Sequence, residues 1–115
     1  MDLTEMLRIL EEAAGDQASL ALANVDLTFH DLPEDDRSAL REALQAAAIP
    51  HWCDVDVLGH LLGSTSHATA VICSRLKEMP LIESFPARGD SAFNVHEASR
   101  LALRAHLASV RSANR

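Results

Sequence analysis

Aromatic residues are scarce in this chain of 115 residues, which contains one Trp, three Phe and no Tyr. With so few rings, the core has to be built from Leu, Ala, Val and Ile, which suits small helices that pack closely. Only two cysteines are present, Cys53 and Cys73, and this number excludes a dense disulfide framework. The N-terminus lacks the basic region and the apolar run of a secretion signal, and no stretch approaches the length of a membrane span. We therefore expect a cytoplasmic protein that makes no contact with a membrane.

Basic residues are outnumbered, with 10 Lys and Arg against 17 Asp and Glu, and the formal net charge is −7. Proteins that bind nucleic acid usually carry a basic balance, because contacts to phosphate supply most of the affinity. The acidic balance therefore argues against a nucleic-acid partner, although a local basic patch could still provide a binding surface. Because 48% of the residues are apolar, the chain should fold, and its length fits one modest core.

The order of the predicted elements is that of a winged helix-turn-helix, so we expect a mainly α fold with a two-stranded β wing. We assign residues 1–30 to an N-terminal helical extension, residues 31–110 to the winged-helix domain and residues 111–115 to a frayed tail. In the extension, apolar residues at helical spacing predict a helix over residues 3–10 and a second helical piece over residues 17–23. Residues 25–29 alternate between apolar and polar, which predicts a short strand.

Three helices are expected in the winged-helix domain before the wing. The first begins at Pro33 and stops before Pro50, and its apolar face is Leu40, Leu44 and Ala47. Asp54 is expected to cap the second helix, and Gly63 should end it in a left-handed conformation. The second helix is expected to bury Val57, Leu58, Leu61 and Leu62. The third helix, capped by Ser64, Thr65 or Ser66, is expected to turn inward Ala68, Val71, Ile72, the stem of Arg75 and Leu76.

The wing is predicted from two short apolar runs, residues 81–85 and 91–95. Residues 86–90 form the turn between them, in which Gly89 can adopt a positive φ. The last helix opens at His96, and we interpret this residue as a structural hydrogen-bonding group that links the wing to that helix or to Arg100. The residues of this helix that are expected to pack on the core are Ala98, Leu101, Leu103, Leu107 and Val110.

A resemblance to a known family rests on three stretches, which read LPEDDRSALREALQAAAIPHWCDVDVLGHLLG, LIESF and FNVHEASRLAL. Together they resemble the winged-helix segment of bacterial STAND-type signalling ATPases and the related modules next to tetratricopeptide repeats. The match spans residues 32–108. Its structural signature is His96, Glu97 and Arg100 after the wing, with Trp52 in the connector.

The resemblance implies a winged helix that transmits conformational change and makes intramolecular contacts rather than binding DNA. No GxxxxGK[ST] phosphate loop occurs in the 115 residues, so the ATPase engine of that family is not in this chain. The chain is therefore either a free-standing module or a piece of a longer protein.

Residues that can bind metals gather in one stretch of the sequence: His51, Cys53, Asp54, Asp56 and His60. Zinc needs about four ligands in a tetrahedron, and no CxxC or HExxH spacing supplies them. We favour a connector in which Trp52 and Cys53 are buried as apolar residues, and a metal-binding switch of His51, Cys53 and His60 is a weaker hypothesis. A cysteine–histidine hydrolase would pair a thiol with a histidine, but Cys73 falls on an apolar helix side, which favours an inert thiol. We therefore expect no enzymatic activity, no cofactor and no bound metal.

DNA binding by a winged-helix transcription regulator is the alternative function. Its contacts would come from Arg75 and Lys77 on the third helix and Arg88 in the wing. Specific readers of DNA usually place more Arg, Lys, Asn or Gln at base edges and phosphates, and Glu83 and Asp90 add repulsion nearby.

The leading hypothesis is a protein-interaction or regulatory module of a bacterial signalling or defence-type protein. Acidic residues are concentrated between Glu11 and Glu42, whereas the C-terminal helix is basic. Its basic residues are Arg100, Arg104, His106, Arg111 and Arg115. Opposite charges at the two ends favour oriented docking, either to a protein partner or neighbouring domain or between copies of the chain.

Overall fold

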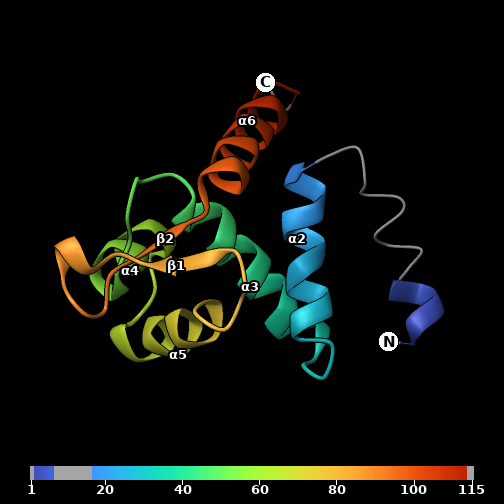
Figure 1. Ribbon diagram of the computed structural model, residues 1–115, viewed down its shortest axis with the longest axis horizontal. Helices are drawn as coiled ribbons and strands as arrows, with labels where there is room; N and C mark the ends of the chain where they lie inside the picture. Colours follow the sequence, from blue (N-terminus) through green and yellow to red (C-terminus); the bar gives the residue numbers. More distant parts are fainter. Residues whose placement is uncertain (1, 7–16, 114–115) are drawn as a thin grey trace.

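The computed structural model describes residues 2–6 and 17–113, with side chains as far as Leu107. It shows a mainly helical domain with a small two-stranded sheet (Figure 1). Residues 3–6 form a short helical turn, whereas Leu7 and Leu10 of the first predicted helix lie outside the described residues. In the described part of the chain, no helix is both long enough and apolar enough to cross a membrane.

Helix α2 (Gln17–Thr28) runs through most of residues 25–29, so the strand predicted there was wrong. The buried residues of α2 are three or four positions apart: Ala18, Ala21 and Val25. Phe29 continues this row just after the helix. Val25 and Phe29 therefore fit one helical face as well as they fit a strand. Packing of this face against α3 and α6 favours the helix.

A cluster of ion pairs joins α2 to α3 (Glu34–Ala47). Asp26 of α2 accepts hydrogen bonds from Arg41 and, at 3.4 Å, from Arg37. Both arginines also pair with Glu34 in the first turn of α3, Arg37 at 3.0 Å. The hydrogen bond from Arg41 lowers the pKa of Glu34. The extension is thereby joined to the winged-helix domain by ion pairs in which Asp26, Arg37 and Arg41 are partly buried and Glu34 is exposed.

The predicted ends of the first helix of the winged-helix domain agree with the structure. α3 begins directly after Pro33 and ends at Ala47, shortly before Pro50. Its predicted apolar face, Leu40, Leu44 and Ala47, is buried. Three acidic residues in the first turn of α3 lie near the positive end of the helix dipole.

The next two helices, α4 (Val55–Leu62) and α5 (Ser66–Leu76), have the caps that the sequence predicts. The amide of Val57 donates to Asp54 Oδ1 at 2.9 Å. Gly63 ends α4 with φ +65°, a left-handed conformation that suits glycine. Of the three candidate caps of α5, Thr65 takes the role, accepting from the amide of Ala68 at 3.3 Å.

The inward faces of α4 and α5 differ from the prediction. Three residues that were expected to face the core are exposed instead: Leu61, Ala68 and Val71. The residues that α5 buries are instead Thr69, Cys73 and Leu76. Thr69 can occupy a buried position because its hydroxyl donates to the carbonyl of Thr65 at 2.7 Å and lies 2.8 Å from Ser64 Oγ. Burial of this satisfied threonine turns α5 by about one residue from the predicted orientation.

The wing forms as predicted, with β1 (Ile82–Ser84) antiparallel to β2 (Phe93–Val95). The turn between them contains a short 3₁₀ helix, η1 (Pro86–Arg88), followed by Gly89 with φ +111°. Cys53 of the connector pairs with the other edge of β2. Its amide donates to the carbonyl of Phe93 at 2.7 Å, and the amide of Phe93 donates back at 2.8 Å. The order of helix, single bridge, two helices and hairpin is that of a winged helix.

The last helix, α6 (Glu97–Ala113), packs against α2 and α3. Leu103 is buried, but Ala98 and Leu101 are exposed, so the prediction that both face the core was wrong. Leu101 is two residues from Leu103 and therefore lies on the opposite side of the helix. The side chain of Val110 lies outside the described residues. The largest fully buried side chains are Phe93, Leu40, Leu44, Leu58, Leu76, Met79 and Leu103.

Candidate functional site

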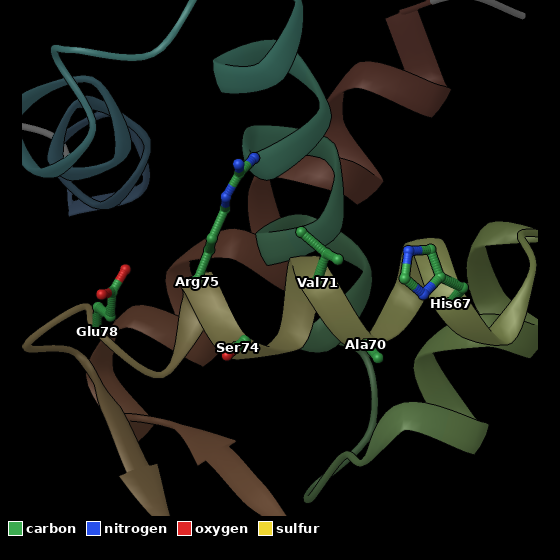
Figure 2. Close-up of a pocket in the computed structure, with 6 residues that line it drawn as sticks. All are labelled: His67, Ala70, Val71, Ser74, Arg75 and Glu78. Atoms are coloured by element: carbon green, nitrogen blue, oxygen red, sulfur yellow. The ribbon is translucent and has the colours of Figure 1, made fainter.

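The outer side of α5, the third helix of the winged-helix domain, carries an open hollow of about 480 Å³. Its lining comes from one side of α5 and the turn after it: His67, Ala70, Val71, Ser74, Arg75 and Glu78 (Figure 2). We call these six residues the α5 face. In Figure 2, Val71 and Arg75 project to the same side of the helix. The α5 face is available because Thr69, Cys73 and Leu76 take the inward positions.

The α5 face mixes apolar, cationic and acidic groups. Val71 is 40% exposed, and it is one of five large hydrophobic residues that are exposed in the described part of the chain. Arg75 is half-buried and Glu78 is exposed, so charges of opposite sign occupy the C-terminal end of the hollow. The α5 face therefore mixes apolar and polar groups, as the surface of a non-obligate protein–protein interface does.

The three cations predicted for DNA contact are placed against three different neighbours. Arg75 lines the α5 face. The ammonium of Lys77 lies 5.8 Å from the centroid of the Phe93 ring, and the guanidinium of Arg88 lies 5.2 Å from that of Trp52. Both distances are typical of cation–π contacts.

Lys77 also has acidic neighbours. It lines a small hollow of about 80 Å³ together with Glu83 and Asp90. Negative potential beside the cation weakens its attraction for phosphate. The structure therefore does not bring Arg75, Lys77 and Arg88 together as one basic surface.

The predicted signature around His96 joins β1 to α6 through the backbone. The His96 amide donates to the carbonyl of Leu81 at 2.7 Å, and the His96 carbonyl accepts from the amide of Arg100 at 2.9 Å. The His96 side chain is exposed, with Nε2 3.7 Å from Glu83 Oε1. Glu97 is exposed in the first turn of α6, whereas Arg100 is buried.

Trp52, the remaining signature residue, is half-buried in the connector between α3 and α4. Its ring lies under the guanidinium of Arg88, as described above. The neighbouring His51 ring meets Phe85 edge to face, with centroids 6.0 Å apart. Together with the Cys53–Phe93 bridge, these contacts fix the connector against the wing.

The five metal-ligand types near the connector do not converge. Asp54 caps α4, His51 packs on Phe85, and His60 is exposed. In the ranges 2–6 and 17–113, no group of three or more His, Cys, Asp or Glu side chains is arranged to hold a metal ion. Of the residues of the metal-switch hypothesis, His51 packs on Phe85 and Cys53 pairs with β2, whereas His60 is exposed.

Both cysteines are buried, as free thiols. Burial raises the pKa of Cys53 to about 12, with smaller contributions from Cys73 and Asp54. Burial also raises the pKa of Cys73. Because the thiolate is the nucleophilic form, these environments oppose thiol chemistry near neutral pH.

Sequence reasoning missed the central feature of this surface, which is the exposure of Val71. The spacing of Val71 from Leu76 and Ile72 predicted that Val71 faces the core. The burial of Thr69 could not be predicted from the pattern of apolar residues, because threonine carries a hydroxyl. A helix containing Thr69 and Cys73 has two weakly apolar faces that the sequence alone does not distinguish.

Comparison of this chain with family models, with curated proteins and with solved structures finds no match.

Proposed function

We propose that this chain is a non-catalytic protein-contact module, which docks a partner protein or a neighbouring domain on the α5 face. The observation that carries the proposal is the composition of that face. The third helix of a winged helix is its usual recognition element. Here that helix lines an open hollow with Val71, Ala70 and Ser74, and one arginine is among the residues that line it.

The resemblance over residues 32–108 supports a regulatory role in a bacterial signalling or defence assembly in the cytoplasm. In that family, the winged helix transmits conformational change through contacts with neighbouring domains. The His96, Glu97 and Arg100 signature carries most of the resemblance, and the net charge of −7 agrees with a partner other than nucleic acid.

The first test of the proposal measures contact with phosphate. Binding to random duplex DNA is followed by fluorescence anisotropy across a salt series. We expect no complex even at low salt, because contacts to phosphate that involve several cations give a steep salt dependence. A complex that weakens steeply with salt, and is lost in the Arg75→Ala variant, would overturn the proposal.

The second test measures protein contact directly. Partners are cross-linked to the chain in its own cells and quantified for the wild type and for Val71→Glu. A carboxylate at the centre of an apolar contact should lower the recovery of a true partner at least about tenfold. Ala105→Glu adds the same charge at an exposed position of α6 and serves as the matched control. Equal recovery with Val71→Glu and the control would exclude the α5 face as the contact surface.

The DNA-binding regulator stays as the second candidate, favoured by the order of the elements. α4 and α5, joined by a short turn and followed by a hairpin, have the arrangement of a DNA-binding winged helix. If the salt series detects binding, Arg75→Ala, Lys77→Ala and Arg88→Ala each test one phosphate contact. Each true contact should reduce the salt slope by about one.

A further inference from the structure

The two ends of the α5 face carry ionisable groups of opposite character. His67 lies in the first turn of α5, and Glu78 lies in the turn that follows the helix, at the other end of the lining (Figure 2). Both side chains are exposed. Between these two ends the helix contributes small side chains to the hollow, those of Ala70, Val71 and Ser74.

The polar side chains of the α5 face have no partner in the part of the chain that the structure describes. Within residues 2–6 and 17–113, the side chains of His67, Arg75 and Glu78 form no hydrogen bond and no ion pair. Arg75 and Glu78 do not pair with each other, although they are three residues apart. The capacity of these groups to bind an opposite charge is therefore available to another molecule.

The six positions of the α5 face have the same spacing when they are read from either end. A two-fold axis perpendicular to the middle of α5 therefore places the face on a second copy of itself with the two ends exchanged. In this antiparallel pair, His67 of each copy lies opposite Glu78 of the other, because a two-fold contact occurs twice. The same symmetry places Val71 opposite Ser74.

We infer that the α5 face binds a second copy of this chain, through an antiparallel pair of α5 helices. The inference rests on the proposed protein-contact function and names the partner. A histidine ring donates a hydrogen bond to a carboxylate in its neutral and in its protonated form, so each end of the pair gains a contact. A parallel pair would instead place Glu78 against Glu78, and like charges oppose such a contact. Small side chains at the centre allow the two helices to approach closely.

The net charge opposes the pairing at long range, because each copy carries −7. At physiological ionic strength the Debye length is about 8 Å, so charges close to the contact have the largest effect. An interface formed by one helix of each copy is small, and small interfaces are weak. We therefore expect dimers to form at concentrations between about 10 µM and about 1 mM.

The test is sedimentation equilibrium of the full chain over this concentration range at physiological ionic strength. Glu78→Arg places a cation opposite His67 at both ends and should weaken association at least about tenfold. His67→Glu places two carboxylates opposite each other and should have a similar effect. Glu42→Arg makes the same change of net charge as Glu78→Arg at an exposed position of α3, and its association should stay within about twofold of the wild type.

A mixture of the two single variants tests the antiparallel arrangement. In a mixed pair of His67→Glu with Glu78→Arg, the two introduced charges have opposite signs and face each other, while the unchanged His67 and Glu78 meet at the other end. A fluorescent label on one variant reports this pair. The mixture should associate at least about tenfold more strongly than either variant alone. Restored association also shows that both variants are folded.

Three results would overturn the inference: a wild type that stays monomeric at about 1 mM, equal association of the wild type and Glu78→Arg, or a mixture that associates no more strongly than its components. In each case the proposed function still stands if Val71→Glu lowers the recovery of a different protein. Equal recovery with Val71→Glu and Ala105→Glu would remove the proposed function as well.

Discussion

Raising the pH above the usual range of a thiol should destabilise the fold through its two buried cysteines. Burial raises the pKa of Cys53 from 9.0 to about 12, and it raises the pKa of Cys73 as well. The folded chain keeps both thiols protonated at a pH where the unfolded chain ionises them. Their contribution to stability is therefore complete below about pH 9 and is lost as the pH rises toward the folded-state values.

The magnitude follows from the separation of the two pKa values of Cys53. Each pH unit between them costs about 1.4 kcal/mol. From about pH 8 to about pH 10.5, ionisation of this thiol should lower the free energy of unfolding by about 2 kcal/mol. Cys73 adds to the loss in the same direction. Few other groups titrate in this range, because the chain contains no Tyr and Lys77 is its only lysine.

The assay is denaturant unfolding in reducing buffer at several pH values, followed by the fluorescence of the single Trp52. Variants of Cys53→Ala and of both cysteines to Ala should have lower stability at neutral pH but a flatter dependence on pH. Lys77→Gln measures the contribution of the lysine. The reasoning would be refuted by a wild-type stability that does not change up to about pH 10.5, or by an equal loss in the double cysteine variant.

Three other substitutions, together with one control variant, test packing and capping. Phe93→Ala should lower the free energy of unfolding by about 3–5 kcal/mol, because the ring is 1% exposed; a urea titration that gives less than about 1 kcal/mol would contradict this packing. Asp54→Ala removes the cap of α4 and should cost about 1 kcal/mol in the same titration. Asp56→Ala, at an exposed position in the first turn of α4, should stay within about 0.5 kcal/mol of the wild type. Gly63→Ala should destabilise the fold by about 1 kcal/mol and lower the thermal midpoint, because the φ of +65° is strained for alanine. No atom lies within 4 Å of the added Cβ, so a steric clash does not contribute. An unchanged midpoint would show that the backbone rearranges.

Local signals in the sequence predicted the elements whose causes are local. Proline before α3, the aspartate cap and the glycine end of α4, and the glycine turn of the wing each act within a few residues. The limits of these elements agree with the structure for that reason. The two apolar runs of the wing were also sufficient to place β1 and β2, because a hairpin pairs neighbouring segments.

Features that depend on contacts between distant segments were not predictable. Residues 25–28 of the expected strand are helical because α2 packs its buried face, which includes Val25, against α3 and α6, and the local alternation does not report these contacts. The outward turn of Val71 follows from the hydrogen bonds of Thr69, which satisfy a buried hydroxyl. The candidate site is affected most, since the α5 face is made of residues that an apolar pattern places elsewhere or does not rank.

The placement of the cations connects the fold to the proposed function. Lys77 and Arg88 are the two predicted DNA contacts outside the α5 face, and each lies over an aromatic ring of the connector or the wing. The chain has few aromatic residues, and these two rings both pack in the wing region and contact the cations. A phosphate could still attract either group, but it would have to compete with the cation–π contact and, at Lys77, with two nearby carboxylates. The wing is thereby better suited to act as a rigid support than as a DNA clamp. The mixed face of α5 is the surface that the proposed function assigns to a partner.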